Sequence, residues 1–471
     1  MKIAVKVLSS VKTYILVVLA AVFFVPLFAW PDEVQVIETK AFLPKDFHPY
    51  RNPFTEAPFF FRLNSINLSH DGGVLISGDK EGPESFFIKL KSDGTTMWLR
   101  DFHQDWRGLT AEYAFDSSSG GYWGIGYIQT RALTPKEMVV QSGSKEYLEI
   151  EESIAYKYLL KMDEQGKQVS MQKISTLFTH NISCGVDVDD GLILVGTQTF
   201  QHEVKDKKEQ KRFTTTPWIE KVGYDGQQIW EQTITDNNGG AFDINLNSKG
   251  SLCDGLVRNS SGFVLGFSVL YRNLEHDGSK TIIDSGEEKR SKLKTVVVKL
   301  DNSGQELKRY VSDDVDGVRI IENNAGYILI EHFSPRIPDA ILNLGPLMAS
   351  GFIGLANSTD GGVRVTSLNN QLVKIGTKEF KIPSINSKFK DVLVGANGQY
   401  YIVGCDKSEK EHYIALNPSS GSVVDFDATK GQAAFQCGNY KWIGVDSKGI
   451  LSLLNSTGLN GDTIKKVKFP N

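Results

Sequence analysis

The sequence lacks the linear motifs of several common enzyme classes. It contains no Gly-x-Ser-x-Gly nucleophile elbow, no His-Glu-x-x-His zinc motif and no Cys-x-x-Cys pair. Its eight histidines are scattered along the chain, and no two have the close spacing of a metal site. The sequence therefore predicts no metal and no cofactor. It leaves open an active site assembled from residues far apart in the sequence, for which no linear motif is needed.

An excess of charge of one sign is also lacking. The chain has 471 residues, with 52 Lys and Arg against 56 Asp and Glu, which gives a net charge of −4. No basic stripe stands out, so we do not expect nucleic acid as a partner. The acidic excess is too small to indicate a cationic substrate.

Long uncharged runs are rare, and the exception lies at the N-terminus. Three lysines within the first 12 residues precede a run from Tyr14 to Trp30 that has no charged residue. This arrangement predicts a signal peptide or a signal anchor over residues 1–30. Cleavage near Ala29 would release the chain, whereas an uncleaved segment over residues 13–30 would attach it to a membrane. In both cases we expect an exported protein, in the periplasm or cell envelope if the source is bacterial, with the inner membrane holding an uncleaved anchor.

Glycine, in contrast, is abundant, with 44 residues, and it marks an internal repeat. The first repeated motif is a turn rich in Asp, Asn and Gly, followed by a short apolar strand that often ends in Gly. Its clear copies are residues 71–78, 119–126, 189–196 and 260–266, and its weaker copies are residues 324–330, 397–404 and 439–444. The second motif is a strand, a turn and another strand, with its best copies at residues 88–94, 160–166 and 298–304 and a variant at residues 221–226. In two copies a tryptophan, Trp98 or Trp230, follows the turn glycine at the same offset.

The two motifs resemble the bacterial β-propeller repeats of the form D-G-G–strand–G followed by K-L-D-x-x-G-x-x-x-W, which are related to the quinoprotein-like propellers. The resemblance covers most of residues 60–460 and implies an all-β fold whose small antiparallel sheets bury their faces by stacking around an axis. Seven copies of the first motif predict a seven-bladed β-propeller of four-stranded antiparallel blades over residues 59–471, after an N-terminal extension over residues 31–58. We expect the segment around Phe59 to Leu63 to close the ring. The resemblance implies a fold and not a function.

In this fold, the connections between the second and third strands of the blades all leave from one face of the ring. They are predicted to be long in blades two to five, at about residues 127–153, 198–216, 271–293 and 332–362, and short in the other blades. Long loops in a compact fold often carry function, and tolerated surface decoration is the alternative.

The long connection of blade five is the most apolar of the four. Two interpretations are open: its side chains fold over the ring as a small core of their own, or they form a docking surface for a protein partner or a membrane. The candidate binding residues are Leu342, Leu344, Leu347, Met348, Phe352 and Ile353.

Cysteine is scarce, with Cys184, Cys253, Cys405 and Cys437 as its only occurrences. An even number in an exported chain suggests disulfides, and four buried thiols are the alternative. Cys184 and Cys253 each precede the first motif in adjacent repeats, while Cys405 follows it in the sixth repeat and Cys437 precedes it in the seventh. These positions predict the pairs Cys184–Cys253 and Cys405–Cys437, each joining neighbouring blades.

Two acidic clusters, residues 187–191 and 313–317, contain carboxylates of the kind that bind calcium. Neither has the ligand spacing of an EF-hand. The first coincides with the predicted turn between the first two strands of blade three, so we expect turns here and no metal site.

Long connections on one face, without a catalytic motif, indicate an exported, non-enzymatic binding scaffold. Its long-loop face, over blades two to five, would hold a protein or an envelope polymer. One alternative is an enzyme, a hydrolase, lyase or oxidoreductase, with its site in the central funnel. Another is an anchored structural protein without a specific ligand. Carboxylates, His or Arg converging at the axis would favour the enzyme.

Overall fold

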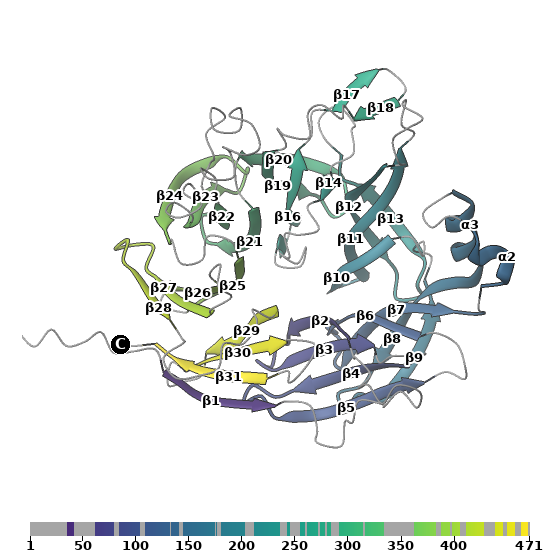
Figure 1. Cartoon of the computed structure of the whole chain (residues 1–471), viewed down its shortest axis with the longest axis horizontal. Helices are drawn as coiled ribbons and strands as arrows, with labels where there is room; N and C mark the ends of the chain where they lie inside the picture. Colours follow the sequence, from purple (N-terminus) through teal and green to yellow (C-terminus); the bar gives the residue numbers. More distant parts are fainter. Residues whose placement is uncertain are drawn as a thin grey trace, which may run out of the picture.

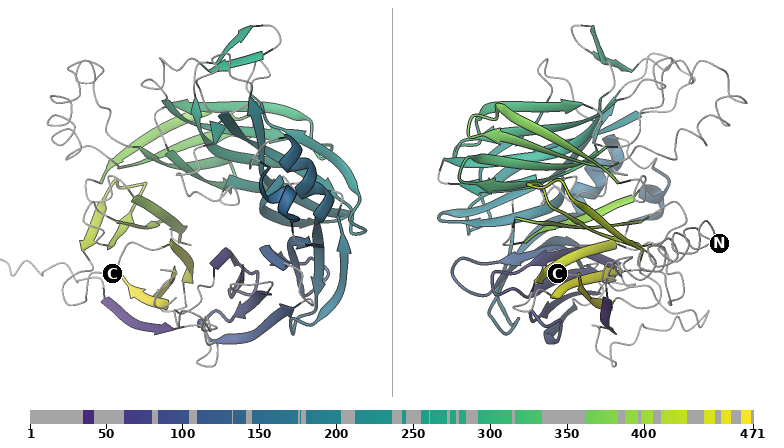
Figure 2. Two further views of the ribbon diagram at one scale, coloured as in Figure 1. Left: turned by 45° about the vertical axis from the view of Figure 1, so that its right-hand side comes forward. Right: turned by 90° about the vertical axis from the view of Figure 1, so that its left-hand side faces the viewer.

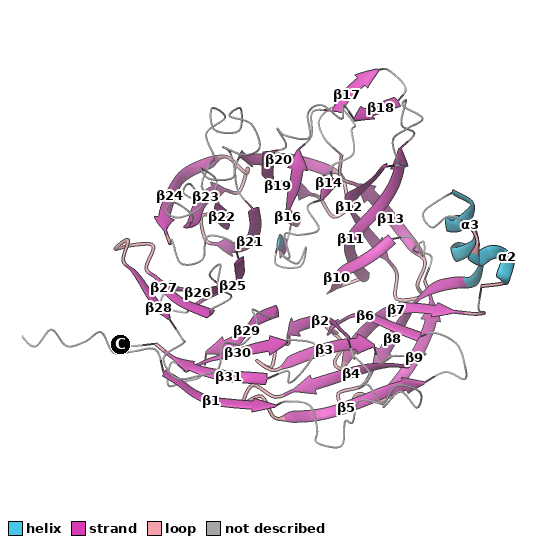
Figure 3. Cartoon of the chain, viewed as in Figure 1, coloured by secondary structure: helices cyan, strands magenta, loops and turns pink. Residues whose placement is uncertain are grey.

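In the part that this computed structural model describes, the protein consists almost entirely of β-strands (Figure 3). The predicted signal or anchor segment, residues 1–30, lies outside the part that the structure describes. Within the described part, no helix has the length and apolar character needed to cross a membrane. The described residues are 35–41, 62–79, 84–103, 109–131, 133–140, 145–174, 176, 180–202, 212–235, 243–244, 255–259, 261–271, 274–277, 280–283, 292–313, 316–333, 362–382, 388–395, 398–405, 411–427, 439–445, 450–456 and 463–469.

Antiparallel sheets follow one another around a ring in sequence order, which makes the fold a β-propeller (Figure 1). In each blade the first strand lies nearest the axis and the fourth lies outermost. Blade one consists of β2 (Arg62–Leu68), β3 (Val74–Asp79), β4 (Glu84–Leu90) and β5 (Thr96–His103). Blade two consists of β6 (Leu109–Asp116), β7 (Tyr122–Gln129), β8 (Ala155–Met162) and β9 (Gln168–Lys173). Blade three consists of β10 (His180–Val188), β11 (Gly191–His202), β12 (Arg212–Val222) and β13 (Gln228–Thr233).

Three more four-stranded blades complete the ring. One contains β21 (Asp316–Asn323), β22 (Gly326–Phe333), β23 (Gly362–Asn369) and β24 (Lys374–Lys381). The next contains β25 (Lys388–Val394), β26 (Tyr400–Cys405), β27 (Glu411–Leu416) and β28 (Val423–Asp427). The closing blade contains β29 (Asn439–Val445), β30 (Ile450–Ser456), β31 (Thr463–Lys468) and β1 (Gln35–Ala41).

The fourth repeat does not form a four-stranded blade. Its sheet has five strands: β14 (Asp243–Ile244), β15 (Leu256–Asn259), β16 (Gly262–Tyr271), β19 (Lys292–Leu300) and β20 (Glu306–Asp313). Both β14 and β15 pair with β16, at its opposite ends. The prediction of seven four-stranded blades is therefore wrong, because the propeller has six of them. The physical reason is that two short strands, β14 and β15, share the inner edge of β16 in place of one continuous first strand.

The ring is closed by the N-terminal strand. β1 pairs with β31 from Gln35 opposite Lys468 to Ala41 opposite Thr463. Leu63, in contrast, pairs with Gly78 inside blade one, so the closing strand lies earlier in the chain than the predicted Phe59 to Leu63. In Figure 1 the closing blade and blade one lie next to each other at the bottom of the ring.

The last repeat also differs from the prediction. Residues 439–444 belong to β29, which pairs only with β30 and is the innermost strand of the closing blade. The sequence motif there had predicted the second strand. This copy of the motif has lost its turn glycine, which would have fixed the position.

The lysine of the second motif makes a similar contact in three blades, which explains its recurrence in the repeat. Lys89 on β4 forms an ion pair with Asp71 in the first turn of blade one, with Nζ and Oδ1 2.6 Å apart. Lys221 on β12 forms the same pair with Asp190 in blade three, at 2.7 Å. In blade two, Lys161 also binds the corresponding turn. Each lysine thus ties the end of the third strand to the first turn of its own blade.

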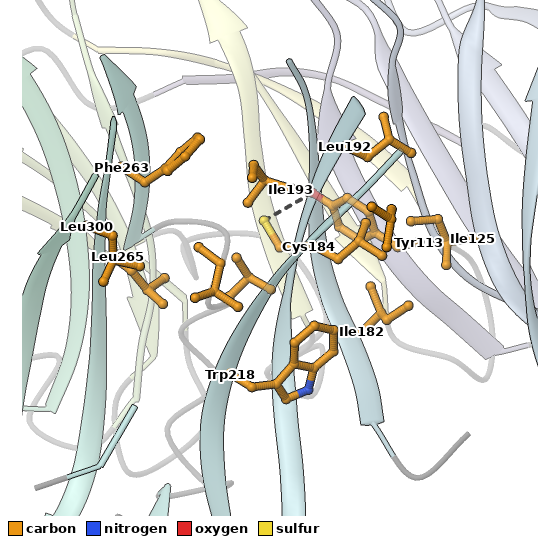
Figure 4. Close-up of a cluster of buried hydrophobic side chains, with 14 of the residues drawn as sticks. Tyr113, Ile125, Ile182, Cys184, Leu192, Ile193, Trp218, Phe263, Leu265 and Leu300 are labelled. Carbon is orange, nitrogen blue, oxygen red and sulfur yellow. Dashed lines mark hydrogen bonds between the residues drawn. The ribbon is translucent and has the colours of Figure 1, made fainter. Parts of the chain in front are cut away.

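Apolar side chains fill the spaces between neighbouring sheets. The largest cluster runs from Tyr113 of blade two, through Cys184 and Trp218 of blade three, to Phe263 and Leu300 of the five-stranded sheet (Figure 4). All five side chains are buried. Stacking of this kind lets small sheets that could not stand alone share one continuous core.

Candidate functional site

The connections between second and third strands carry the additional secondary structure of the ring. In blade two the connection from β7 to β8 contains α2 (Pro135–Met138) and α3 (Lys145–Ile154). In the fourth repeat, the connection from β16 to β19 contains the hairpin of β17 (Leu274–Asp277) and β18 (Lys280–Ile283). Both project from the ring, as the two views of Figure 2 show. We call this side of the propeller the long-connection face.

Blade three contributes a longer hairpin than the sequence predicted. Its second and third strands stay paired out to His202 opposite Arg212. The connection is therefore limited to residues 203–211, and the remainder of the predicted segment is regular sheet. The long connection of the fifth repeat, with Leu342, Leu344, Leu347, Met348, Phe352 and Ile353, lies outside the described residues.

The first part of the blade-two connection is held by a capping box. Thr134 and Glu137 bind each other's backbone N–H groups around α2. Arg131 makes two parallel hydrogen bonds to the Glu137 carboxylate, each 2.8 Å long. These bonds, first of all those from Arg131, lower the pKa of Glu137 to about 2. The same connection presents Val139, which is 83% exposed, so the loop is ordered by polar contacts and shows an apolar side chain to solvent.

A buried acidic residue lies in blade three at a position that is apolar in other repeats. Glu220 directly precedes the motif lysine, where Ile88, Leu160 and Val298 stand in other sheets. All four side chains are buried. The hydroxyl of Thr176, in the segment that enters blade three from blade two, donates to Oε2 of Glu220 at 2.6 Å. Burial raises the pKa of Glu220 to about 7, against the opposing effect of the Thr176 hydrogen bond.

Two further ionisable groups belong to this cluster. Glu231 on β13 lies directly opposite Glu220 in the strand register, and burial raises its pKa as well. The imidazole of His180 on β10 packs against the Trp218 indole, with ring centroids 4.9 Å apart. Its Nε2 lies 3.9 Å from Oε1 of Glu231. We call Thr176, His180, Trp218, Glu220 and Glu231 the blade-three cluster.

A second buried carboxyl lies at another boundary between sheets. Glu331 on β22 accepts a hydrogen bond from Thr366 at 3.2 Å, and burial raises its pKa. Thr366 occupies on β23 the repeat position that Glu220 occupies on β12, because each lies opposite the fourth residue of its neighbouring second strand, Leu329 and Leu194 respectively. Polar groups have thus replaced the aliphatic side chain at this position in two of the repeats.

The acidic turn of blade three, at residues 187–191, makes structural contacts with blade two. The Asp187 carboxylate accepts hydrogen bonds from the Ser118 backbone at 2.8 Å, from the Trp123 indole at 2.9 Å and from the Tyr224 hydroxyl at 2.6 Å. Trp123 and Tyr224 stack with their rings nearly parallel. Burial acts to raise the pKa of Asp187, but these hydrogen bonds hold it below its ordinary value. The carboxylate joins blade three to the first turn of blade two. The turn expected from the sequence is therefore present.

The cysteines follow the prediction only in part. Cys184 is a buried thiol whose sulfur lies 3.9 Å from the Tyr113 hydroxyl that donates to it. The predicted pair Cys184–Cys253 is therefore wrong for this structure, because Cys184 is a thiol and not half of a disulfide. Cys405 is disulfide-bonded. Its partner lies outside the described residues, as both Cys253 and Cys437 do. The pair Cys405–Cys437 therefore stays a prediction.

Sequence reasoning missed the blade-three cluster, although a signal was present. Aligning the second motif on its lysine places Glu220 in a column with Ile88, Leu160 and Val298. A carboxyl in a column of buried aliphatic residues is the informative exception in such an alignment. Within the described ranges, no group of three His, Cys, Asp or Glu side chains is arranged to hold a metal ion.

Comparison with known proteins finds solved structures of low similarity. No protein-family model matches the sequence, and no curated protein matches it. Among solved structures, it is similar to a proposed 6-phosphogluconolactonase from Bacteroides fragilis, with 11% identity, coverage of 89% of this chain and 98% of that chain, and a TM-score of 0.37. It is also similar to the Neurospora crassa Pan2 WD40 domain, with 10% identity, coverage of 93% and 96%, and a TM-score of 0.30. It is similar as well to prolyl oligopeptidase B from Galerina marginata, with 11% identity, coverage of 87% of this chain and 52% of that chain, and a TM-score of 0.39. Each likeness concerns the fold and carries no activity to this chain.

Proposed function

We propose that the protein is an exported, non-enzymatic binding scaffold that holds a protein or an envelope polymer on its long-connection face. The observation that carries the proposal is the placement of α2, α3 and the β17–β18 hairpin, all in connections of that face. The opposite face has tight turns, such as those at residues 69–73 and 163–167. A rigid ring with variable segments on one side is a common arrangement for recognition.

The ionisable clusters in the described part of the chain favour binding over catalysis. Glu220 and His180 are almost fully buried, and Glu331 is buried between strands of neighbouring sheets. A catalytic acid or base has to reach a substrate within hydrogen-bond distance. Among these groups only Glu231 has a side chain with appreciable exposure, 27%. The enzyme alternative would need groups that open toward solvent.

The partner is proposed to be contacted by several connections at once. Val139 offers an exposed apolar side chain in blade two, and the exposed residues Glu146 and Glu149 of α3 offer negative charge. We propose that Leu342, Leu347 and Phe352 of the fifth repeat add an apolar contact area. A mixed apolar and charged surface of this kind suits a protein partner.

The test replaces one connection at a time. In the first variant, residues 130–154 are exchanged for a link as short as residues 80–83 of blade one, and in the second, residues 336–356 are deleted. The matched control carries Glu164→Ala and Gln165→Ala in the tight turn of blade two on the opposite face. Partners captured from native envelope extracts are identified, purified and measured by calorimetry, with circular dichroism confirming the fold. We expect at least a ~10-fold loss of affinity for a connection variant and none for the control. Unchanged affinity in both connection variants would contradict the proposal.

Export is tested separately. We expect the full chain in the periplasmic or envelope fraction and a chain lacking residues 1–30 in the cytosol. The intact mass of the exported protein then distinguishes a cleaved signal from an anchor over residues 13–30. A full-length chain that stays in the cytosol would contradict this part of the proposal.

A further inference from the structure

The blade-three cluster places two carboxyl groups where the repeat provides no counter-charge. Glu220 and Glu231 are cross-strand neighbours on β12 and β13, and directly opposite residues have their Cβ atoms about 5 Å apart. Like charges in this arrangement destabilise a sheet even at the surface. Here Glu220 is fully buried, so two ionised carboxylates would also lose their hydration.

Among the described residues, the groups that act on Glu220 are the Thr176 hydroxyl and the Glu231 carboxyl, and no cation is among them. At the start of β10 lies His180, whose Nε2 is 3.9 Å from Oε1 of Glu231, whereas Asp187 near its other end binds the turn of blade two. On β13 lies Glu231 itself, whose other polar neighbour is the neutral Gln228. The segment that enters from blade two provides the hydroxyl of Thr176. Oε1 of Glu220 has no hydrogen-bond partner among the described residues.

The blade-two side of this boundary is already neutralised. The N–H of Ile174 donates to the carbonyl of Lys157 at 3.1 Å, which fixes the start of the segment to β8. The ammonium of Lys157 binds both oxygens of Glu112 at 2.8 Å. This lysine is therefore committed to a carboxylate of its own blade.

We propose that Glu220 and Glu231 hold one proton between them, and that this proton keeps the boundary between blades two and three closed around Thr176. With the proton on Oε1 of Glu220, the neutral carboxyl is compatible with its apolar repeat position, and Oε2 accepts the Thr176 hydroxyl. When the proton leaves for solvent, two carboxylates face each other across the strands. Glu231 is the partly exposed member of the pair, so it provides the path to water and the side chain that swings out. The ionised Glu220 then lacks the hydration that its buried position denies it, so an opening of the boundary between blades two and three that exposes it to water becomes more favourable.

The sign of the effect follows from the direction of the shift. A carboxyl whose pKa rises from 4.5 to about 7 on folding makes the closed state less stable as pH rises between these values. Opening that exposes Glu220 should therefore become ~30-fold more favourable between about pH 5.5 and about pH 8.5. Below about pH 4.5 and well above pH 7, the dependence on pH should vanish.

The experiment measures hydrogen exchange of a peptide spanning residues 170–182 at several pH values, corrected for the intrinsic exchange rate. The wild type should lose protection ~30-fold over this pH range, whereas E220Q should show a flat profile. The matched control is E331Q, which removes another buried carboxyl at a different boundary and should leave the wild-type profile of this peptide unchanged. A flat wild-type profile, a persisting dependence in E220Q, or its loss in E331Q would overturn the proposal.

A second measurement does not depend on any variant folding. In wild-type protein labelled with 13C at the glutamate carboxyl carbons, one resonance should titrate near pH 7, and E220L, which restores the aliphatic residue of other repeats, should lack it. If all glutamates of the wild type titrate near their ordinary value of 4.5, the shared proton does not exist.

Discussion

The indole of Trp98 in blade one lies directly against Gly166 in the last turn of blade two. Its Nε1–H donates to the carbonyl of Glu164 at 3.0 Å. The same relation joins Trp230 of blade three to the five-stranded sheet, where the indole packs on Gly304. In these two cases the tryptophan that follows the turn glycine of one sheet packs on the turn glycine of the next sheet. Gly166 and Gly304 thus each contact the tryptophan of the preceding repeat.

Gly166→Ala is expected to destabilise the protein by about 2–4 kcal/mol. The residue has φ of +75°, and a Cβ would lie 2.7 Å from the Trp98 ring. Backbone strain and overpacking against the ring would therefore both destabilise the variant. The free energy of unfolding in urea measures the effect. The control is Gly376→Ala on β24, which has no heavy atom within 4 Å of its Cβ position and should change stability by less than ~0.5 kcal/mol. Equal effects of the two substitutions would contradict the contact.

Lys465→Met is expected to cost about 3–5 kcal/mol. Lys465 on β31 and Glu411 on β27 form a buried ion pair between the last two blades, with Nζ and Oε1 2.6 Å apart. Removing the lysine leaves a buried carboxylate without its counter-charge. Adding Glu411→Gln should recover more than half of the loss, as measured by urea unfolding in a double-mutant cycle. The exposed Lys374→Met on β24 serves as control, and a coupling energy near zero would refute the prediction.

Asp187→Asn is expected to lower stability by about 1.5–3 kcal/mol near pH 7, because charge-assisted hydrogen bonds to the turn of blade two are lost. The pKa of Asp187 in the folded protein lies below the ordinary value of 3.8. Its contribution is therefore present above pH 3.8 and is lost as pH falls through the folded pKa. Unfolding measured near pH 7 and near pH 2 should show the difference between wild type and variant shrinking in acid. Asp189→Asn, at a side chain that is 94% exposed, should have little effect at either pH.

Reduction of the Cys405 disulfide is expected to lower stability by about 2–4 kcal/mol. Peptide mapping without reductant should find Cys405 linked to Cys437, as predicted from the sequence. Cys184 should react with a thiol reagent only after unfolding, because it is 2% exposed. A bridge from Cys405 to Cys253, or rapid labelling of Cys184 in the native protein, would contradict these assignments.

Local chemistry made much of the fold predictable. Glycines at turns, such as Gly94 and Gly166, have positive φ in the structure, and in the first six repeats the apolar strand after the turn is the one that the first motif predicts. The long connections of blade two and of the fourth repeat were also predictable, because the distance between the two motifs reports loop length directly. These features depend on neighbours in sequence.

What the sequence did not predict depends on partners far apart in the chain. The pairing of β1 with β31 joins residues more than 400 positions apart, and nothing in the local pattern of Gln35–Ala41 specifies its partner. The split first strand of the fourth repeat was not predictable either, because β14 and β15 are separate in the sequence and are related only through their pairing with β16. Glu220 was not recognised for a different reason. It directly precedes a copy of the second motif that was assigned from its lysine and its turn, so the residue before the lysine was not compared with the other repeats.

Closure by the first strand has a consequence for biosynthesis. During translation β1 is made long before β31, and until then one edge of Gln35–Ala41 lacks its native neighbour. An unsatisfied strand edge is prone to pair with other chains, and sheets that depend on distant partners assemble slowly. The nascent protein should therefore need protection of its leading end until synthesis is nearly finished, and a chain that stops before Thr463 would leave that edge permanently open.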